Sequence, residues 1–386
     1  MLKKILYSIV IAMIIFIAIG FFLPREVHVE RSRIIDRSPA TLYAVLNDYR
    51  QFSAWSPWAA RDPDAEYRLS GPETGPGSRM SWEGDPRQVG SGWQEIVESR
   101  PYSLIRVSLY FDQQGPATSY FQLDPVQGGT RVTWGFDTDL LEGQGWMGGI
   151  LARYFGLFFD TWIGTDYEQG LARLQQYAER LPAADFSDLD VDIVDVAPQD
   201  IFYVDSDTVL GSADITSSLV LAYREIAEYM VAHGIERAGQ PMTITRAREG
   251  GRYVVEAAVP VLLPPSGLPA LDAQAAPAGK SAGDREPGEA GPGEPSPDTA
   301  TSSAAAEPVS RVRTGKAPSG RAVRAVHRGA HDRMGPTYEK LAAWMAVNGI
   351  EEGSVSWEQY ISDPGETPDT DLITHIFFAI EAEQPE

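Results

Sequence analysis

The chain has 386 residues, 43% of them hydrophobic and 22% charged, a length and a composition typical of two folded globular domains. Its formal net charge of −22 argues against a nucleic-acid-binding surface, because affinity for nucleic acid comes mainly from clustered lysine and arginine. The chain contains no cysteine, which excludes disulfide bonds, cysteine nucleophiles and thiolate metal sites.

An uncharged apolar stretch runs from Ile5 to Leu23 and ends at Pro24. As a helix it would be about 28 Å long, close to the hydrocarbon core of a bilayer, which is about 30 Å thick. A cleaved signal peptide has a shorter apolar region that ends at a small-x-small site, whereas apolar residues continue here past Gly20. We therefore predict that residues 1–24 form an uncleaved, single-pass transmembrane anchor.

Two sets of basic residues flank the anchor and favour opposite orientations. Lys3 and Lys4 favour an N-terminus in the cytoplasm, whereas the other side of the anchor carries Arg25, Arg31, Arg33 and Arg37. Long acidic domains can cross a membrane largely regardless of their charge. We therefore expect the protein in a bacterial-type inner membrane, with its soluble domains in the periplasm.

The region 25–181 is predicted to begin with a strand over 27–35 and a short helix that Ser38 caps and Pro39 opens. Glycine- and proline-rich turns separate the strands that we predict near 77–84, 89–100, 102–112, 118–124 and 130–140. A long helix closes the region, because apolar residues recur at helical spacing at Ile163, Tyr167, Leu171, Leu174, Ala178 and Leu181. The apolar stripe of this helix needs the concave face of the sheet as a partner. A curved sheet that grips one long helix tends to leave a cavity.

This order of elements resembles the START-like, polyketide-cyclase-type (SRPBCC) superfamily. The resemblance is carried by the segment 38–43, by Trp55-Ser56-Pro57-Trp58, and by residues 167–171 in the last helix. It implies an α+β, helix-grip (Bet v 1-like) fold with an apolar tunnel for lipids, polyketides or other hydrophobic molecules.

Four aromatic residues on the predicted strands are candidates for the cavity wall: Trp82, Trp93, Trp134 and Phe136. Packing in a solid core is the alternative for each, and the more common one, since aromatic side chains bury large areas wherever they lie. No arrangement of nucleophile, acid and base is visible in this domain, whose one histidine is His28. We therefore predict no catalytic residue here.

After a linker over 182–190, residues 191–386 form a second domain that contains an internal repeat. The helical pattern 223–234 recurs at 338–349, and a glycine follows each helix, at Gly234 and Gly349, where a left-handed conformation is favoured. One strand precedes each helix and two follow it; the predicted strands are 200–204, 242–246 and 253–261, then 321–328, 355–361 and 372–380. The repeat predicts a pseudo-twofold α+β domain with one groove between its halves.

The two copies are separated by residues 264–310, which are rich in proline, glycine, alanine, serine and acidic residues and contain no aromatic residue. A segment of this composition cannot bury enough apolar surface to become ordered. We predict a disordered insertion, and a tail that binds a partner is the alternative.

The second domain resembles the GyrI-like, or AraC/BmrR effector-binding, domain. The resemblance rests on the segments 317–320, 327–329, 338–344 and 356–360, the last of which reads Ser-Trp-Glu-Gln-Tyr. It implies that the strand glutamate faces the groove and receives an organic cation between aromatic rings. In this chain that role falls to Glu358.

On a strand, Glu358 and Tyr360 point to one face and Trp357 to the other. A carboxylate beside aromatic rings holds a cation by Coulomb attraction and by cation–π contact, the latter worth about 0.5–2 kcal/mol. We predict Glu358 as the main ligand-binding residue, with Tyr360, Tyr338 and Trp357 as further candidates. The alternative is that Glu358 is a solvated edge residue.

The chain departs from regulators that carry such a domain, because no basic segment with a helix-turn-helix pattern is visible. We therefore expect no nucleic-acid partner. His327 and His331 are separated by Gly329 at the end of a strand, so we predict no metal site. No phosphate-binding glycine loop is visible, and we expect no cofactor.

The leading hypothesis is a membrane-anchored small-molecule-binding protein that acts in sensing or sequestration. Its first domain would take a hydrophobic or lipid-like ligand, and its second an amphipathic or cationic one. The main alternative is an enzyme, either a cyclase or a hydrolase with Glu358 as acid or base. A third hypothesis is a protein-interaction module, which would present a broad exposed apolar patch; the sequence indicates no particular protein partner.

Overall fold

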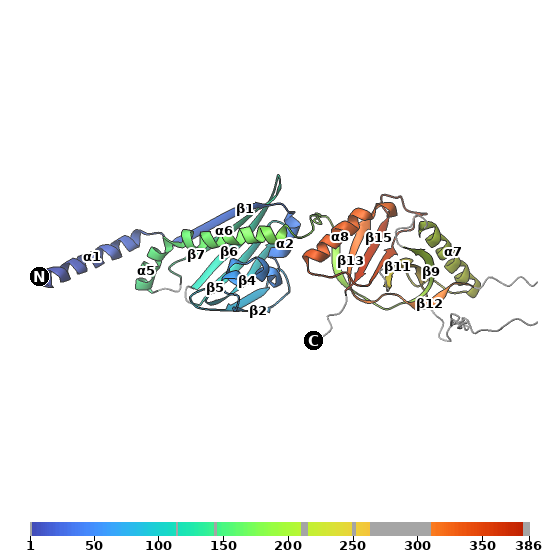
Figure 1. Ribbon diagram of the computed structural model, residues 1–386, viewed down its shortest axis with the longest axis horizontal. Helices are drawn as coiled ribbons and strands as arrows, with labels where there is room; N and C mark the ends of the chain where they lie inside the picture. The colour runs from blue at the N-terminus through green and yellow to red at the C-terminus, as the bar shows by residue number, and fades with distance from the viewer. Residues whose placement is uncertain are drawn as a thin grey trace, which may run out of the picture. The chain divides into compact units, whose positions relative to one another are not determined.

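The computed structural model describes residues 2–112, 115–142, 145–209, 215–248, 252–262 and 310–380. The chain divides into two compact units (Figure 1). The first comprises residues 1–191 with 332–352, and the second comprises residues 192–331 with 353–386. The predicted insertion at 264–310 lies outside the described residues, apart from Ser310.

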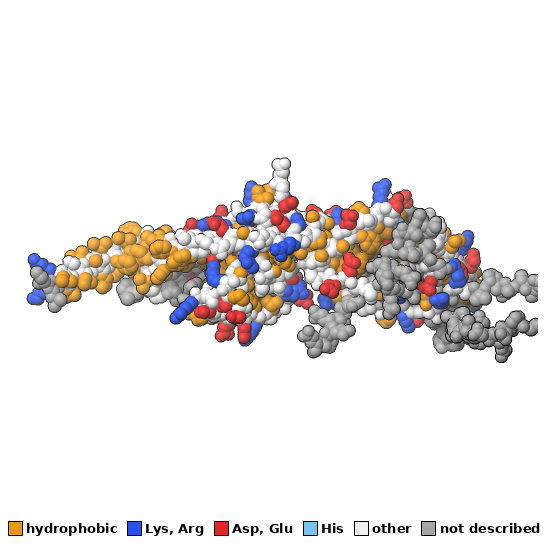
Figure 2. All heavy atoms as spheres, in the orientation of Figure 1, with side chains coloured by type: hydrophobic (Ala, Val, Ile, Leu, Met, Phe, Trp, Pro, Cys, Tyr) orange, Lys and Arg blue, Asp and Glu red, His pale blue; other side chains and the backbone are white. Residues whose placement is uncertain are grey.

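The first unit begins with helix α1 (Leu2–Phe22), which covers the predicted anchor. Among the described residues it is the one helix long and apolar enough to cross a membrane, and hydrophobic side chains cover it (Figure 2). Helix α5 (Trp146–Gly156), which the sequence pattern does not predict, packs against it. The Tyr154 ring of α5 stacks on Phe16 with ring centroids 4.1 Å apart, and its hydroxyl donates to the Phe16 carbonyl.

Seven of the described strands form the sheet of the first unit, in the order β1-β7-β6-β5-β4-β3-β2, and all neighbours are antiparallel. Their bounds are β1 Glu26–Ile35, β2 Glu66–Ser70, β3 Arg79–Glu83, β4 Ser91–Arg100, β5 Leu104–Phe111, β6 Gly115–Val126 and β7 Gly129–Asp139. Buried residues alternate with half-buried ones along β4 and β5, because one face of the sheet is covered. The predicted strands of this domain are confirmed. β2 was missed because its residues are mostly polar and exposed.

Short helical elements connect β1 to β2: α2 (Pro39–Leu46), the 3-10 turn η1 (Tyr49–Gln51), α3 (Phe52–Trp55) and α4 (Pro57–Arg61). The Ser38 hydroxyl accepts a hydrogen bond from the Thr41 N–H at 3.3 Å, which confirms the predicted cap. The Ser56 hydroxyl accepts from the Trp58 and Ala59 amides at the start of α4. Each cap stabilises its helix by about 0.5–2 kcal/mol.

Helix α6 (Phe159–Ala178) lies along the sheet (Figure 1) and buries Leu171 and Leu174 against it. Full burial of a leucine stabilises a fold by about 1.5–3 kcal/mol. Gly170 permits the close approach, because a Cβ atom there would lie 2.5 Å from the Trp134 ring. The predicted closing helix and the α+β, helix-grip fold are confirmed.

Eight of the described strands form the sheet of the second unit, in the order β12-β9-β11-β10-β14-β15-β13-β8. Their bounds are β8 Asp190–Val196, β9 Asp200–Val209, β10 Met242–Arg248, β11 Arg252–Pro260, β12 Arg313–Lys316, β13 Gly320–Arg328, β14 Val355–Tyr360 and β15 Ile373–Ala379. The order is symmetric about the β10–β14 pair, since β9, β11 and β10 correspond to β13, β15 and β14. The pseudo-twofold prediction is confirmed, and two strands that were not predicted, β12 and β8, extend the symmetry to both edges.

The helices of the two copies are α7 (Ile215–His233) and α8 (Gly335–Val347). α7 packs on β9 and β11 through Ala222, Ile226 and Met230. Gly234 and Gly349 follow the two helices with φ angles of 62° and 67°. The left-handed conformation predicted at both glycines is therefore confirmed.

Candidate ligand-binding sites

A cavity of about 360 Å³ lies in the first unit, bounded by the sheet, by α6 and by the short helices α3 and α4. Each strand from β3 to β7 contributes side chains to its wall. Most of these side chains are aromatic or aliphatic; examples are Met80, Leu109, Phe121 and Ile163. The first unit therefore contains a cavity beside a packed hydrophobic core.

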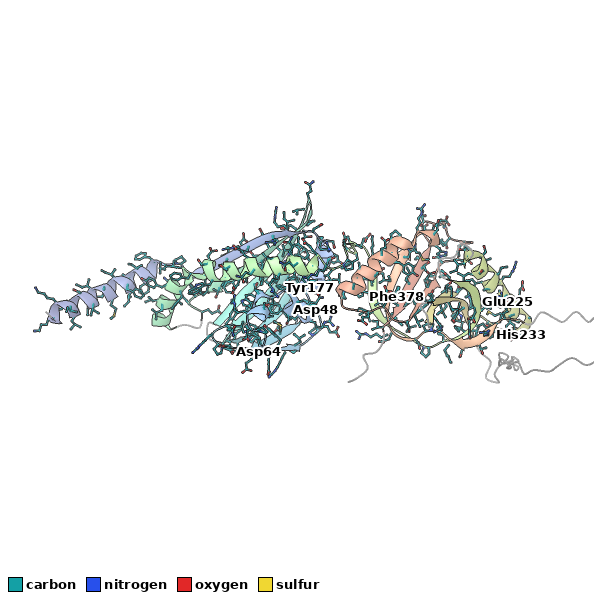
Figure 3. The ribbon with its side chains drawn as sticks, in the orientation of Figure 1. Asp48, Asp64, Tyr177, Glu225, His233 and Phe378 are labelled. Atoms are coloured by element: carbon teal, nitrogen blue, oxygen red, sulfur yellow. The ribbon has the colours of Figure 1, made fainter. Side chains whose placement is uncertain are left out.

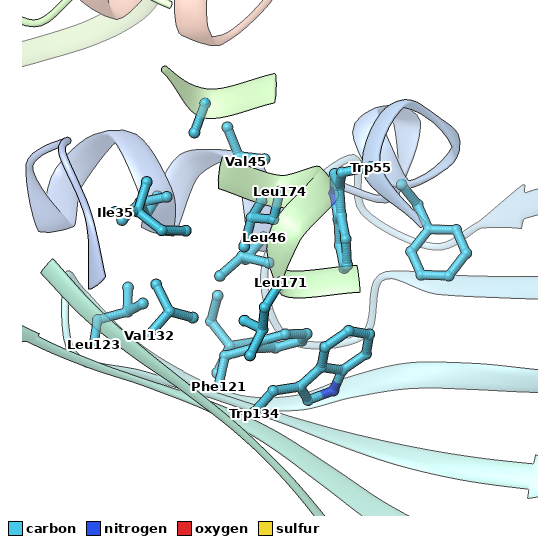
Figure 4. Packing of buried hydrophobic residues seen from close by; sticks show 14 of the residues in the cluster. Ile35, Val45, Leu46, Trp55, Phe121, Leu123, Val132, Trp134, Leu171 and Leu174 are labelled. Carbon is cyan, nitrogen blue, oxygen red and sulfur yellow. The ribbon is translucent and has the colours of Figure 1, made fainter. Parts of the chain in front are cut away.

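Trp134 of β7 forms the centre of the aromatic wall. Its ring stacks on Tyr167 of α6, with centroids 3.9 Å apart and planes inclined by 11°. Trp55 meets it edge-on at 5.6 Å, and Phe121 lies 4.9 Å away. Figure 4 shows Phe121 and Trp134 below the helix that carries Leu171, and Trp55 beside that helix. These contacts hold the wall in one arrangement.

Three of the four aromatic residues predicted for the cavity, Trp82, Trp134 and Phe136, lie in its wall. Trp93 does not line it: its ring stacks on Tyr110 at 5.9 Å, and the Arg79 guanidinium lies 3.9 Å from its centre. Successive side chains of a strand point to opposite faces, so Gln94 faces the cavity instead. Sequence reasoning missed Gln94 because one polar residue in a strand gives no signal of burial.

Several polar groups of the wall are hydrogen-bonded within the protein. The Trp134 indole N–H donates to the Ser119 hydroxyl at 3.0 Å, and that hydroxyl donates to the Gly135 carbonyl at 2.9 Å. The Trp82 indole donates to the Val89 carbonyl at 3.2 Å, and the Trp58 indole donates to Asp166 at 3.1 Å.

Three residues that line the cavity each have a buried polar atom without a hydrogen-bond partner among the described residues: the Tyr49 hydroxyl, the Trp55 indole nitrogen and the Gln94 amide nitrogen. The Trp55 side chain belongs to the Trp-Ser-Pro-Trp segment noted in the sequence, but that pattern does not indicate which indole lacks a partner. Tyr49 carries no sequence signal.

The charged groups of the wall form ion pairs within the protein. Arg61 pairs with Asp166. Asp48, labelled in Figure 3, accepts from the Arg50 guanidinium, with Nη2 2.8 Å from Oδ2. Arg61, Asp48 and Asp166 line the cavity, so the ionised side chains of its wall supply no unpaired positive charge.

His28 lies outside the cavity wall, on β1. Its Nδ1 atom is 2.7 Å from Asp137 Oδ1, and its Nε2 atom is 3.5 Å from Glu30. The hydrogen bond to Asp137, aided by the charges of Asp137 and Glu30, raises the pKa of His28 above its ordinary value. Its chemistry is thus that of a surface ion pair.

We expect the imidazole of His28 to titrate above pH 6.5 in the folded protein, and the Asp137→Asn substitution to lower the midpoint toward 6.5. Because the pKa is higher in the folded than in the unfolded chain, the stabilisation is complete below pH 6.5 and is lost as the pH rises through the folded pKa. An NMR titration of the histidine ring protons measures the midpoint. The same midpoint in wild type and Asp137→Asn would contradict this assignment.

In the second unit, four polar side chains form a hydrogen-bonded series. The Tyr223 hydroxyl of α7 lies 3.0 Å from Thr243 Oγ1 of β10, which lies 2.8 Å from the Tyr360 hydroxyl. The Tyr360 hydroxyl donates to Glu358 Oε2 at 2.8 Å. Burial, reinforced by the charge of Glu358, raises the pKa of Tyr223 and Tyr360 above the ordinary value, so both hydroxyls stay protonated at neutral pH. The series holds the Glu358 carboxylate in a defined orientation.

Glu358 and Tyr360 thus lie together on one face of β14, as their spacing predicts. Trp357 lies on the opposite face, buried and stacked on Phe377 with ring centroids 4.7 Å apart. Tyr338 is half-buried on α8. Sequence reasoning missed Tyr223 and Thr243, which belong to the first copy of the repeat. The ligand roles of the four predicted residues stay predictions.

Two family models match separate parts of this chain. Residues 26–179 match the family described as polyketide cyclase / dehydrase and lipid transport, a match that begins at β1 and ends beside the last residue of α6. Residues 294–381 match the GyrI-like small molecule binding domain, which includes the second copy of the repeat. No curated protein matches the chain.

Several solved structures match part of this chain at low identity. Protein CV1439 from Chromobacterium violaceum is 16% identical, with 40% of this chain and 98% of that chain covered and a TM-score of 0.28. The C-terminal domain of EcmrR is 15% identical, with 50% of this chain and 98% of that chain covered and a TM-score of 0.32. A complex of EcmrR with DNA is 14% identical, with 62% of this chain and 73% of that chain covered and a TM-score of 0.33.

Proposed function

We propose that this chain, which joins a domain of the polyketide cyclase, dehydrase and lipid transport family to a GyrI-like small-molecule-binding domain, is a membrane-anchored sensor or carrier of small organic molecules. Each domain would bind its own ligand, a hydrophobic molecule in the first and an organic cation in the second. The observation that carries the proposal is the aromatic cavity between the sheet and α6.

The size and lining of this cavity support a hydrophobic ligand in the first domain. Ligand pockets in proteins commonly measure about 300–1,000 Å³ and are lined mainly by apolar and aromatic side chains with a few polar groups. The cavity, with its volume of about 360 Å³, falls in this range. We therefore assign it a compact hydrophobic or lipid-like molecule.

The orientation of Glu358 supports a cationic ligand in the second domain. Tyr360 donates to one carboxylate oxygen of Glu358 at 2.8 Å and fixes its orientation. A fixed anion beside an aromatic ring attracts an organic cation by charge and by cation–π contact. The net negative charge of the protein adds a weak attraction for a cation.

Exposed apolar side chains next to α1 support the membrane anchor. Around the end of α5 and the start of α6, five large apolar side chains are about half exposed: Leu151, Phe155, Leu157, Phe158 and Trp162. Arg153, in the same segment, donates to the Phe21 carbonyl near the end of α1 at 2.7 Å. We assign this surface to the membrane interface, on the periplasmic side. There an aromatic residue such as Trp162 is favoured.

Native mass spectrometry of the detergent-purified full chain tests the first ligand. We expect a hydrophobic molecule to co-purify with the wild type and with Glu358→Gln. Val107→Phe adds bulk to the cavity wall and is expected to release the molecule, at a cost to folding of about 1–3 kcal/mol. Circular dichroism checks that this variant is folded. Absence of any bound molecule from the wild type, together with failure to bind added hydrophobic probes, would refute the assignment.

Calorimetry with benzyltrimethylammonium tests the second ligand. Glu358→Gln is expected to weaken binding of this cation at least about tenfold, the equivalent of about 1.4 kcal/mol, because it removes the charge and keeps the shape. Glu366→Gln, which neutralises an exposed glutamate, is the matched control and is expected to bind as the wild type does. Equal affinities in both variants would remove Glu358 from the proposal.

A further inference from the structure

The cavity of the first unit lies toward the end of the sheet where α1 leads into β1. At that end Glu26, the first residue of β1, pairs with Asp139 of β7. The residues of β5, β6 and β7 that lie nearest this end line the cavity, among them Leu109, Phe111, Ser119, Phe121, Trp134 and Phe136. Toward the other end, Ile105, Leu123 and Val132 belong to the packed core and not to the cavity wall. The cavity therefore occupies the part of the unit next to α1.

Wall residues that are exposed mark where the cavity reaches the surface. Among its described wall residues, four are exposed: Arg61, Pro86, Gln88 and Trp162. Contacts tie these positions together. Arg61 pairs with Asp166, which follows Trp162 by one turn of α6. Asp62, next to Arg61, accepts a hydrogen bond at 2.7 Å from the backbone amide of Asp85, next to Pro86. The exposed wall residues thus border one mouth, and Trp162 is its aromatic side chain.

Trp162 belongs at the same time to the apolar surface around the end of α5. Its ring stacks on Phe158 with centroids 5.6 Å apart, and both side chains are about half exposed. Residues 146–159 contain a single charge, that of Arg153, which donates to the Phe21 carbonyl near the end of α1. A cationic side chain is favoured at that end of a helix. The surface that leads from α5 to the mouth is therefore apolar.

Contacts with α1 set the depth of α5 in a membrane that α1 crosses (Figure 1). Tyr154 of α5 stacks on Phe16 and donates to its carbonyl, and a Cβ atom on Gly20 would lie 2.6 Å from Ile150. Phe16 lies six residues before Phe22, the end of α1, which corresponds to about 9 Å along the helix. The apolar face of a helix at a membrane surface lies about 5–10 Å deep. Tyr154 would reach the same depth, which places α5 in the lipid.

From these observations we propose that α5 lies in the leaflet that adjoins the first domain, and that the cavity takes up a membrane lipid directly from this leaflet, past Trp162. The inference rests on the proposed function, because it assumes that α1 crosses a membrane and that the cavity holds a hydrophobic ligand. It adds the source of that ligand and the part of it that enters, an acyl chain. A chain that moves from hydrocarbon into an apolar cavity avoids the cost of exposing its surface to water.

Fluorescence quenching in liposomes tests the position of α5. The chain has no cysteine, so Phe155→Cys and Val97→Cys each provide one site for a nitrobenzoxadiazole label. Both side chains are about half exposed, but Val97 lies on β4 toward the far end of the sheet. In phosphatidylcholine–phosphatidylglycerol liposomes with doxyl groups on the acyl chains, we expect labelled Phe155→Cys to lose most of its emission and labelled Val97→Cys to keep it. Equal emission from the two would overturn the placement of α5.

Photolabelling of the full chain in the same liposomes tests the route. The probe is a phosphatidylcholine with a diazirine in one acyl chain, and mass spectrometry locates its adducts. In the wild type we expect adducts on α5 and on the cavity wall at Phe111 and Phe136. Trp162→Asp places a carboxylate at the mouth, and an apolar chain can pass it only by removing its water. This variant is expected to reduce labelling of the wall at least about tenfold.

Val97→Asp is the matched control for Trp162→Asp, because it makes the same change at a half-exposed apolar position away from the mouth. It is expected to label as the wild type does. Circular dichroism checks that both variants are folded.

The outcomes distinguish this inference from the proposed function. If the wall is labelled equally in Trp162→Asp and in the wild type, the route past Trp162 is overturned and the lipid-binding cavity stands. If α5 is labelled and the wall is not, uptake from the leaflet is overturned. A hydrophobic molecule found in the same protein by native mass spectrometry would then still support the proposed function. If the protein does not associate with liposomes, the anchor and the uptake from the leaflet both fail.

Discussion

Trp134→Ala is expected to lower the free energy of unfolding of the first domain by about 3–5 kcal/mol, the usual cost of removing a large buried aromatic side chain. Trp134 is 3% exposed, stacks on Tyr167, and donates its indole N–H to Ser119. The substitution removes all three contributions and enlarges a hollow that already exists, so the surroundings cannot close around the gap.

Hydrogen exchange of the amides of β6 and β7 in the full chain measures this effect, because it reports the opening of one domain without assuming two-state unfolding of both. Trp162→Ala is the control: it removes the same side chain from a position that is 52% exposed, and it is expected to cost less than about 1 kcal/mol. If the two substitutions destabilise the domain equally, Trp134 does not organise the wall.

Arg246→Ala is expected to destabilise the second domain by about 3 kcal/mol, near the lower limit for breaking a buried ion pair. Arg246 Nε donates to Glu256 Oε2 at 3.1 Å across the β10–β11 pair. Glu256 is 4% exposed, so without Arg246 its carboxylate stays buried and loses that partner. The arginine side chain is about one third exposed. The expected destabilisation is therefore smaller than that for a fully buried ion pair.

Hydrogen exchange of the β10 and β11 amides reports this second effect. Arg324→Ala is the matched control on the same sheet: its partner Asp192 is about half exposed, and loss of a surface pair costs at most about 1 kcal/mol. The double substitution Arg246→Met with Glu256→Met is expected to recover most of the loss, because it removes the buried charge itself. A double variant as unstable as Arg246→Ala would show that packing, and not the charge, explains the effect.

Much of the fold could be predicted because the sequence patterns that indicate its helices and strands extend over only a few residues. The apolar spacing from Ile163 to Ala178 indicates a helix whatever it packs against, and a glycine after each repeated helix marks where that helix ends. The elements that were missed have weak local signals. β2 is short and exposed, and β12 is a four-residue polar strand whose existence depends on pairing with β9.

The candidate sites were less accessible to prediction. Glu358 was found through a family resemblance carried by neighbouring residues, whereas Thr243, two hydrogen bonds away from it, lies more than a hundred positions earlier in the chain. In β4, aromatic character favoured Trp93 as a cavity residue over Gln94. The pairing register of β4 with β3 and β5 decides which of its side chains point into the cavity. Amino-acid composition does not reveal that register.

The sequence alone predicts the order of the domains, the kind of most of their elements and the repeat in the second domain, because periodicity, caps and helix-ending glycines act over a few residues. Which buried polar groups have a hydrogen-bond partner in the protein depends instead on the tertiary structure. The indoles of Trp55 and Trp134 are the same chemical group, and they differ because strand pairing brings the Ser119 oxygen to one of them and no described acceptor to the other.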